Sequence, residues 1–407
     1  MNRQPYLEAF CLRTPVAAHY DLLMTIDSTH APAFGTTRQF PHVMLREIFE
    51  QPQALADTLA YYTQDGRLAR EPMLAAHSAL LGHERIVVAA SGSSRHAGLA
   101  GEIMLEDIAG LAVDVEYASE YCYRSTHTLH NPAVIVISQS GETADTLAAL
   151  REARSRGMQT AAITNHNDSS MAKEARASLP VCAGPEKAIP ATKSFTGQLL
   201  VLYLLSLSLA HQRGRMTLNV ADSMCGEALA LPEMIAKALP AWEQQVQELA
   251  ASYREATAFL FLGRGIHYSI AREGALKLKE SSYTHAEGYP AGELKHGPNA
   301  LVGPETPLVV LATHDPKDHD SLLRYSKVVQ LLKDMRQQGA QVFALANEGD
   351  KEVPQYSQHC VFVPRCSEYL LPICEVIPLQ FFAYQIAMLH GRNVDHPRNL
   401  VKAVIQE

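Results

Sequence analysis

The sequence predicts an α/β protein built on doubly wound parallel sheets, and three observations support this class. Short apolar runs alternate with helical stretches, the alternation occurs twice along the chain, and 47% of the 407 residues are hydrophobic. Strands that alternate with helices form parallel sheets through crossover connections. The length allows about two to three domains at roughly 150 residues each, and the hydrophobic share is ample for their cores. A disordered chain is excluded.

The first copy of the pattern lies between about residues 86 and 164. Each β-rich run is followed by a polar turn and then by a helical stretch. The expected strands are 86–90, 133–138 and 159–164, and the expected helices end near residues 108 and 155.

The second copy begins near residue 258 and follows the same layout. The segment between the copies, 219–254, is expected to be helical and amphipathic, so we expect the domain boundary near residue 240. The expected strands of the second copy are 258–262, 307–313 and 341–347, and an expected helix covers 321–338.

One polar loop at the predicted sheet edge has the composition of an anion site. Ligands of open parallel sheets bind beyond the carboxyl ends of the strands, where the loops 91–94, 138–143 and 263–265 lie. The hydroxyls of Ser138, Ser140 and Thr143, with the amides of a helix start, form a potential anion cradle. No Gly-Lys-Ser/Thr follows, which argues against a nucleoside triphosphate. The alternative is simple helix capping by Ser140, but the hydroxyl-rich loop at 91–94 favours a phosphate site.

A second polar group lies at 273–298. Lys277 and Glu280 are three residues apart on an expected helix and share a face, which is usually solvated. We expect the Gly- and Pro-rich segment 285–298 to be a loop whose two His and two Glu suit either a metal or acid–base chemistry. The His-Glu-x-x-His zinc pattern is absent, so we expect acid–base groups and no metal.

Composition argues against several other classes. The 35 Lys and Arg against 43 Asp and Glu give a net charge of −8, which argues against nucleic-acid binding. No run approaches ~20 consecutive apolar residues, so we expect no membrane-spanning helix, and the first residues lack the apolar region of a signal peptide. The seven cysteines are dispersed and contain no Cys-x-x-Cys, as in a reduced, cytoplasmic protein.

Four segments resemble, in this order, the isomerase half of glucosamine-6-phosphate synthase, which consists of two tandem sugar-isomerase (SIS) domains. The segments are 138–146, 273–280, 292–298 and 397–402, and the resemblance extends from about Pro41 to Glu407. It implies an N-terminal arm at 1–40, a first SIS domain with leading helices at 41–240, a second SIS domain at 241–395 and a C-terminal active-site tail at 396–407.

The resemblance also implies roles for single residues. Glu280, assisted by Lys277, would move a proton between C1 and C2 of a hexose 6-phosphate, and Lys402 would form a Schiff base with the open ketose. His296 would open the sugar ring from the neighbouring subunit, which implies a homodimer. No cofactor is implied. The implied phosphate-binding residues are Ser138, Gln139, Ser140 and Thr143, and the implied sugar-binding residues are Ser94, Ile189, Ala191 and Val401.

These roles suit the chemistry. A proton moved between adjacent carbons needs one carboxylate that takes it and returns it, and the phosphate serves as a handle that orients the reacting carbons.

The chain departs from the family at two places. The family usually has Gly-Val-Ala-Ser where this chain has residues 188–191; Pro190 stiffens the loop, and Ala191 removes a hydroxyl that would touch the sugar. At the start, residue 2 is Asn and the first cysteine is Cys11. About 40 residues cannot house the family's glutaminase domain with its N-terminal nucleophilic cysteine.

We therefore expect a glucosamine-6-phosphate deaminase that gives fructose 6-phosphate and ammonia. One alternative is synthesis of glucosamine 6-phosphate from free ammonia or from a separate amidotransferase subunit, and a related amino-sugar phosphate is another possible substrate. A further alternative is a sugar-phosphate sensor, which would need the 138–143 cradle but not Glu280, His296 or Lys402.

Overall fold

The computed structural model describes residue 34 and residues 38–69, 71–124 and 132–405. Cys11, almost all of the expected 1–40 arm and the last two residues lie outside this range. The chain divides into two units, Met1–Thr37 and Arg38–Glu407, and the description below concerns the second unit.

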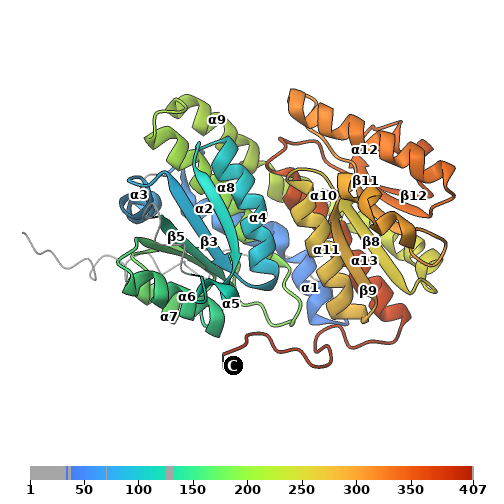
Figure 1. The fold of residues 1–407 in the computed structure, drawn as a ribbon, viewed down its shortest axis with the longest axis horizontal. Helices are drawn as coiled ribbons and strands as arrows, with labels where there is room; N and C mark the ends of the chain where they lie inside the picture. Colours follow the sequence, from blue (N-terminus) through green and yellow to red (C-terminus); the bar gives the residue numbers. More distant parts are fainter. Residues whose placement is uncertain (1–33, 35–37, 70, 125–131, 406–407) are drawn as a thin grey trace, which may run out of the picture. The chain divides into compact units, whose positions relative to one another are not determined.

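Two parallel five-stranded sheets organise this unit (Figure 1). Their orders are β4-β3-β5-β6-β7 and β9-β8-β10-β11-β12, so the second sheet repeats the topology of the first strand by strand. This confirms the expected pair of doubly wound sheets. The strands are β3 (Arg85–Ala90), β4 (Ala112–Tyr117), β5 (Ala133–Ser138), β6 (Thr160–Thr164), β7 (Ala177–Pro180), β8 (Ala258–Gly263), β9 (His285–Pro290), β10 (Leu308–Leu311), β11 (Val342–Asn347) and β12 (His359–Val363).

Helices connect and cover the strands. The short hairpin of β1 (Thr63–Gln64) and β2 (Arg67–Leu68) lies outside both sheets. The helices are α1 (Val43–Phe49), α2 (Gln51–Tyr62), α3 (Leu74–Leu80), α4 (Gly92–Asp107), α5 (Ala118–Tyr121), α6 (Ala144–Ser155), α7 (Ser170–Glu174), α8 (Lys193–Gln212), α9 (Leu218–Leu229), α10 (Leu231–Ala250), α11 (His267–Ser282), α12 (His319–Gln337) and α13 (Leu371–Leu389). The 3-10 helices are η2 (Glu71–Met73), η4 (Ala251–Tyr253), η5 (Ala291–His296), η6 (Pro298–Leu301) and η7 (Val353–Gln355).

Each sheet has a core on both faces. In β3, Val88 belongs to the large core that contains α4 and α8, whereas its neighbour Val87 belongs to a smaller core with α6. In β8, Phe261 likewise joins the large core and Leu262 a separate core with α12. Strands buried on both faces read as continuous apolar runs, which is why the central strands were predictable. The large core lies between the domains and holds α4 and α11 against each other.

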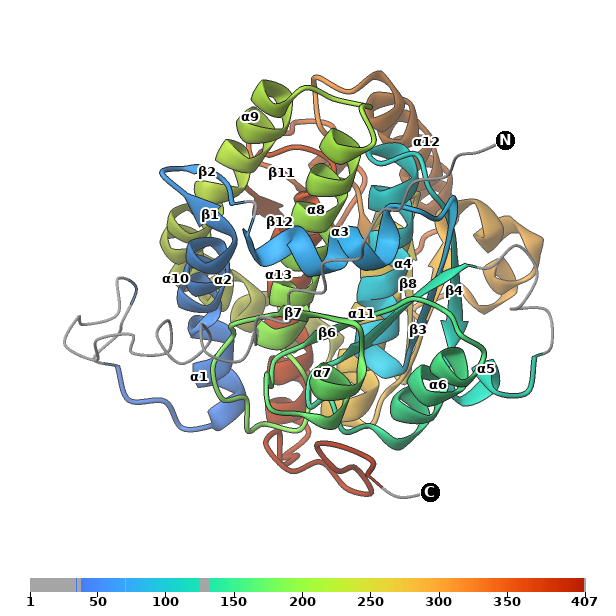
Figure 2. The ribbon, with the colours of Figure 1, turned by 90° about the vertical axis from the view of Figure 1, so that its left-hand side faces the viewer.

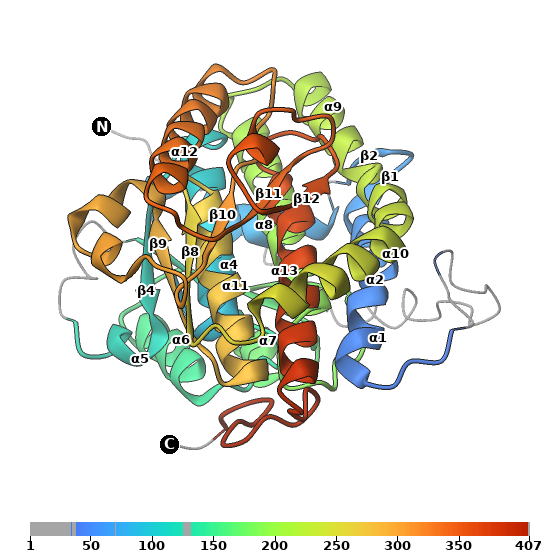
Figure 3. The same cartoon turned by 90° about the vertical axis from the view of Figure 1, so that its right-hand side faces the viewer.

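Two long apolar helices fill this core. In Figure 2, α8 runs beside α4 and α2, and in Figure 3, α13 runs beside α11 and α10. Both α8 and α13 are long and apolar enough to cross a membrane by length and composition alone, but their apolar windows are 94% and 89% buried within the chain. The burial accounts for their composition as core helices of the two domains.

Four strands of the two large sheets were not predicted from the sequence, nor was the β1–β2 hairpin, and one predicted loop was wrong. The segment 285–298 begins as β9, an edge strand paired with β8 on one side only. Its side chains are mostly half-exposed, so the sequence shows no apolar alternation. The other unpredicted strands, β4, β7 and β12, are also short or only partly buried. Between the domains, the expected helical segment forms α9 and α10, and residue 240 lies inside α10.

Candidate functional site

The loop after β5 builds a cradle of hydroxyls. Ser138 ends β5, and its Oγ lies 3.0 Å from Thr143 Oγ1 and 3.4 Å from Ser140 Oγ. The Gly141 amide donates to Ser138 Oγ at 3.1 Å. Gly141 has φ +66°, and a Cβ there would meet Ser169 Oγ at 2.1 Å, so only glycine fits. The chain thus turns tightly enough to bring three hydroxyls to the start of α6.

The simple capping interpretation of Ser140 is wrong. The N-cap of α6 is Thr143, and its side chain makes no capping hydrogen bond. Ser140 Oγ instead accepts the amide of Glu142 at 3.1 Å within the loop. The first amide of α6, at Ala144, donates to the carbonyl of Val404 in the C-terminal tail at 2.9 Å. The tail, which follows α13 of the second domain, therefore reaches the anion cradle of the first domain (Figure 1).

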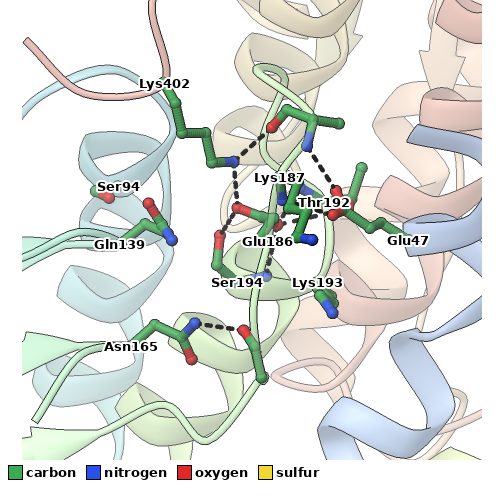
Figure 4. Close-up of polar contacts among 12 residues, drawn as sticks. Glu47, Ser94, Gln139, Asn165, Glu186, Lys187, Thr192, Lys193, Ser194 and Lys402 are labelled. Atoms are coloured by element: carbon green, nitrogen blue, oxygen red, sulfur yellow. Dashed lines mark hydrogen bonds and ion pairs between the residues drawn. The ribbon is translucent and has the colours of Figure 1, made fainter. Parts of the chain in front are cut away.

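The tail also delivers Lys402 to a buried carboxylate. Lys402 Nζ donates to Glu186 Oε2 at 2.6 Å and to the Ala188 carbonyl at 2.7 Å (Figure 4). Glu186 also accepts the Thr192 amide at 2.9 Å and the Ser194 hydroxyl at 2.7 Å. Burial alone would raise the pKa of Glu186, but Lys402 and these donors outweigh it and lower the pKa. The carboxylate is therefore ionised and holds Lys402 in place through an ion pair.

Glu47 of α1 supports the loop from the other side. Its buried carboxylate accepts the amides of Lys187 at 2.6 Å and Ala188 at 3.3 Å (Figure 4). Burial raises the pKa of Glu47 to about 7. The loop that includes Ile189 and Ala191 is thus fixed by a residue from a leading helix. Ile189 is also tied to the tail, because its amide donates to the Asp395 carbonyl at 3.2 Å.

The Lys277 and Glu280 pair lies on α11 and faces the interior rather than solvent. The Lys277 side chain is 1% exposed, and its Nζ lies 2.5 Å from Glu280 Oε2 and 3.5 Å from Glu273 Oε1. Burial would lower the pKa of Lys277, but the two carboxylates raise it. Glu273 is itself bonded to Nδ1 of His96 at 2.8 Å. The Lys277 ammonium therefore lies beside Glu280, the carboxylate to which the family resemblance assigns proton transfer.

The remaining predicted residues fall into two groups. Ser94 Oγ accepts from Gln198 Nε2 at 3.1 Å, and Gln139 Nε2 lies 3.5 Å from His166 Nε2. Figure 4 shows Ser94 and Gln139 on one side of Glu186 and Glu47 on the other. His296 and Val401 are exposed; His296 lies on η5, next to the edge strand β9. Among the described residues, no hydrogen bond or ion pair joins His296 to Glu280 or Lys402.

Sequence reasoning missed Glu47, Glu186, Glu273 and His96. Glu273 lies within the 273–280 segment that was singled out, and its four-residue spacing to Lys277 was a usable signal. Glu186 and Glu47 gave none, because their partners are distant in the chain.

Comparison with known proteins identifies the family. The SIS domain model matches residues 79–208 and 252–390. The isomerizing glutamine–fructose-6-phosphate aminotransferase of Chlorobaculum tepidum is 40% identical over 372 residues, which are 90% of this chain and 59% of the relative. That of Thermus thermophilus is 42% identical over 371 residues, with the same shares of 90% and 59%. The chain therefore spans about 59% of the length of these relatives.

Solved structures agree. The glucosamine-6-phosphate deaminase of Thermotoga maritima has a TM-score of 0.66 at 23% identity, covers 89% of this chain and 99% of its own, and shows a shared fold alone. The C-terminal domain of glucosamine-fructose-6-phosphate aminotransferase from Francisella tularensis has a TM-score of 0.82 at 31% identity, over 89% of this chain and 100% of that chain. With its two matched domains and this architecture, the chain belongs to the SIS-domain family.

Proposed function

We propose that the chain interconverts glucosamine 6-phosphate and fructose 6-phosphate plus ammonia, in the deaminating direction. The observation that carries the proposal is the meeting of Lys402 and Glu186 at the edge of the first sheet, with Nζ and Oε2 2.6 Å apart. A lysine forms an imine only after it loses its proton and leaves its ion pair, and until then Glu186 holds the Lys402 amine at this edge. The hydroxyl cradle at 138–143 supplies the site for the phosphate handle.

The reaction would proceed in two stages. Glu280 takes the proton from C2 of the open amino sugar and returns it to C1, while one amine proton moves to the former aldehyde oxygen, which gives the ketose imine. Lys402 then attacks C2, ammonia leaves, and water hydrolyses the lysine imine to release fructose 6-phosphate. Lys277 orients Glu280 and stabilises its carboxylate by charge.

The cysteines support release of ammonia rather than its supply from glutamine. Glutamine hydrolysis through cysteine needs an accessible thiolate. Burial raises the pKa of Cys182 and Cys225 to about 11 and that of Cys360 to about 12. These three thiols of the described residues are therefore protonated at neutral pH. The dispersed, reduced cysteines also support a cytoplasmic location.

Synthesis of glucosamine 6-phosphate is the second candidate. It is favoured by the 40–42% identity to aminotransferases, and it would use free ammonia or a separate amidotransferase subunit. Both directions share the same site residues, so only turnover distinguishes them.

Incubation with glucosamine 6-phosphate tests the function directly. We expect ammonium and fructose 6-phosphate in equal amounts, and a loss of about 10²–10⁴-fold in kcat for Glu280→Gln. Glu255→Gln, whose side chain is 95% exposed, is the matched control and should retain full activity. Product formation only from fructose 6-phosphate and ammonium would establish the synthetic direction. Tight binding of glucosamine 6-phosphate without turnover in either direction would establish a sensor and contradict the proposal.

We also propose that His296 acts across a homodimer, which its exposure on η5 supports. If so, mixing inactive His296→Ala and Lys402→Ala chains restores about a quarter of wild-type activity, because mixed dimers contain one intact site. Glu280→Gln mixed with Lys402→Ala is the control; both residues serve the same site, so no activity should return. A fully active monomer in sedimentation would contradict the shared site.

A further inference from the structure

We propose that His96 is a positioning residue that holds the proton-transferring carboxylate in place from across the domain interface. His96 lies on α4 of the first domain, whereas Glu273, Lys277 and Glu280 lie on α11 of the second. This inference rests on the proposed function of Glu280 and extends it to a residue that touches no reacting atom.

A continuous chain of polar contacts links His96 to Glu280. His96 Nδ1 lies 2.8 Å from Glu273 Oε2, Glu273 Oε1 lies 3.5 Å from Lys277 Nζ, and this Nζ lies 2.5 Å from Glu280 Oε2. The exposed fractions of Glu273 and Lys277 are 0%. The pKa of Glu273 is lowered, with Lys277 and His96 outweighing burial, so the carboxylate accepts and His96 Nδ1 carries the donated proton.

The distances from Lys277 Nζ to its two carboxylate neighbours show that Lys277 pairs with Glu280 rather than with Glu273. Its ammonium sits a full ångström closer to Glu280 than to Glu273, at 2.5 Å against 3.5 Å. A buried carboxylate without a partner is costly. Glu273 Oε2 lies 2.8 Å from His96 Nδ1, and the Ser93 side chain gives the carboxylate a further, weaker hydrogen bond. His96 thus satisfies Glu273 and leaves Lys277 free to hold Glu280.

We expect that removal of His96 would change which carboxylate pairs with Lys277. Glu273 would then be left with the Ser93 side chain and the Lys277 ammonium. The flexible four-carbon stem of lysine lets this ammonium swing from Glu280 toward Glu273. Glu280 would lose its orienting contact while the phosphate cradle at 138–143 stayed intact. A misplacement of about 1 Å at a reacting group costs on the order of 10²-fold in rate. The effect should therefore fall on kcat rather than on KM.

Two substitutions separate positioning from mere packing. His96→Val removes the donor, whereas His96→Asn keeps an amide N–H at the position of the imidazole Nδ1–H. We expect His96→Val to lower kcat by about 10–100-fold with KM within about threefold, and His96→Asn to recover most of the rate. With glucosamine 6-phosphate deuterated at C2, we expect a larger primary isotope effect on kcat in His96→Val than in wild type, because proton transfer becomes rate-limiting.

The outcomes are distinguishable. A His96→Val protein with a lower melting temperature but unchanged kcat and isotope effect would overturn the positioning role, as would parallel loss in both variants. If wild type turns over no amino-sugar phosphate, the proposed function fails, and a crystal structure of His96→Val still decides the positioning. Lys277 Nζ displaced toward Glu273 supports it, and an unmoved Nζ overturns it.

Discussion

The carboxyl edges of the two sheets share one topology but have opposite chemistry. In the first domain, the N-cap of α6 is Thr143, whose side chain makes no capping hydrogen bond. Its hydroxyl lies 3.0 Å from the hydroxyl of Ser138, which ends β5. In the second domain, the N-cap of the corresponding helix α12 is Asp318, whose carboxylate accepts the amides of Asp320 at 2.8 Å and Ser321 at 2.9 Å. The start of α12 is thus capped by a carboxylate of its own chain, whereas α6 has no such carboxylate and its first amide, at Ala144, donates to the Val404 carbonyl.

At the carboxyl edge of the second sheet, charged side chains also pair with one another. His267 is 3% exposed and lies 2.7 Å from Glu375 and 3.3 Å from Glu368. Arg324 adds a contact of 2.9 Å to Glu368. At the second edge, buried charges thus pair with one another, whereas the first edge presents the hydroxyls of Ser138, Ser140 and Thr143, where we propose that the substrate phosphate binds. Substitutions at each edge test this difference.

The largest effect is expected for Lys402→Ala at the first edge. If Lys402 forms the proposed imine, its loss should reduce kcat by about 10⁴-fold or more, since covalent catalysis would be lost altogether. The measurement is steady-state turnover of glucosamine 6-phosphate, with borohydride trapping of the lysine adduct in wild type. Lys237→Ala, whose side chain is 74% exposed, is the control and should behave as wild type. Residual activity above about one tenth would show that Lys402 forms no obligatory imine.

His267→Ala at the second edge should act on stability instead. It leaves Glu375 buried without its cation, which costs about 3–5 kcal/mol in the free energy of unfolding. We expect kcat/KM of the folded variant within about threefold of wild type, because His267 begins α11 and lies 13 residues, about 20 Å along the helix, before Glu280. Urea denaturation measures the loss, and a large fall in kcat/KM at full stability would show that the second edge takes part in the reaction.

The same cluster predicts a pH dependence. Burial opposes the charge of His267, but Glu375 and Glu368 outweigh it and raise the pKa from 6.5 to about 10. Because the pKa of His267 is higher in the folded protein, its charged form stabilises the fold fully below pH 6.5. This stabilisation is lost as the pH rises through about 10. The difference in unfolding free energy between wild type and His267→Ala should therefore shrink from pH 6 to 10. A constant difference would show that His267 is not charged in the folded protein.

Exchange of the N-cap residues Thr143 of α6 and Asp318 of α12 tests the difference between the two sheet edges directly. Thr143→Asp places a carboxylate where the substrate phosphate would bind, so KM should rise by about 10–100-fold while the capped helix gains about 0.5–1 kcal/mol. The reciprocal Asp318→Thr should leave KM unchanged and lower stability by up to about 1 kcal/mol. Kinetics and thermal unfolding of both variants decide it. Equal KM values for wild type and Thr143→Asp would place the phosphate elsewhere.

The smallest effect is expected for Ala191→Ser, which adds back a hydroxyl in the loop next to Pro190. One added hydrogen bond to the sugar is worth about 0.5–1.5 kcal/mol, so KM for glucosamine 6-phosphate should fall by about 2–10-fold. A comparison of KM with other amino-sugar phosphates measures the change in preference. If KM rises for all of them, the loop does not contact the sugar as we propose.

The sequence by itself predicted the parts of the fold and of the site that depend on neighbours in the chain. The central strand β5 was expected at 133–138 and occupies Ala133–Ser138, because a buried parallel strand is a continuous apolar run. The position of the Ser138–Thr143 loop was predicted as well, because the loop directly follows this strand. The edge strand β9 was mistaken for a loop, because a strand paired on one side carries no such run.

The sequence thus determined the two repeated α/β domains and the Ser138–Thr143 cradle at the end of β5. Only the tertiary structure decided which charges meet. Glu186 lies 216 residues from Lys402, and His96 lies 177 residues from Glu273. Lys277 and Glu280 appeared on a solvated face from their spacing, but packing of α11 between the domains buried Lys277 and left the Glu280 side chain 21% exposed. Spacing along a helix fixes which residues share a face, whereas burial and pairing depend on the elements packed opposite.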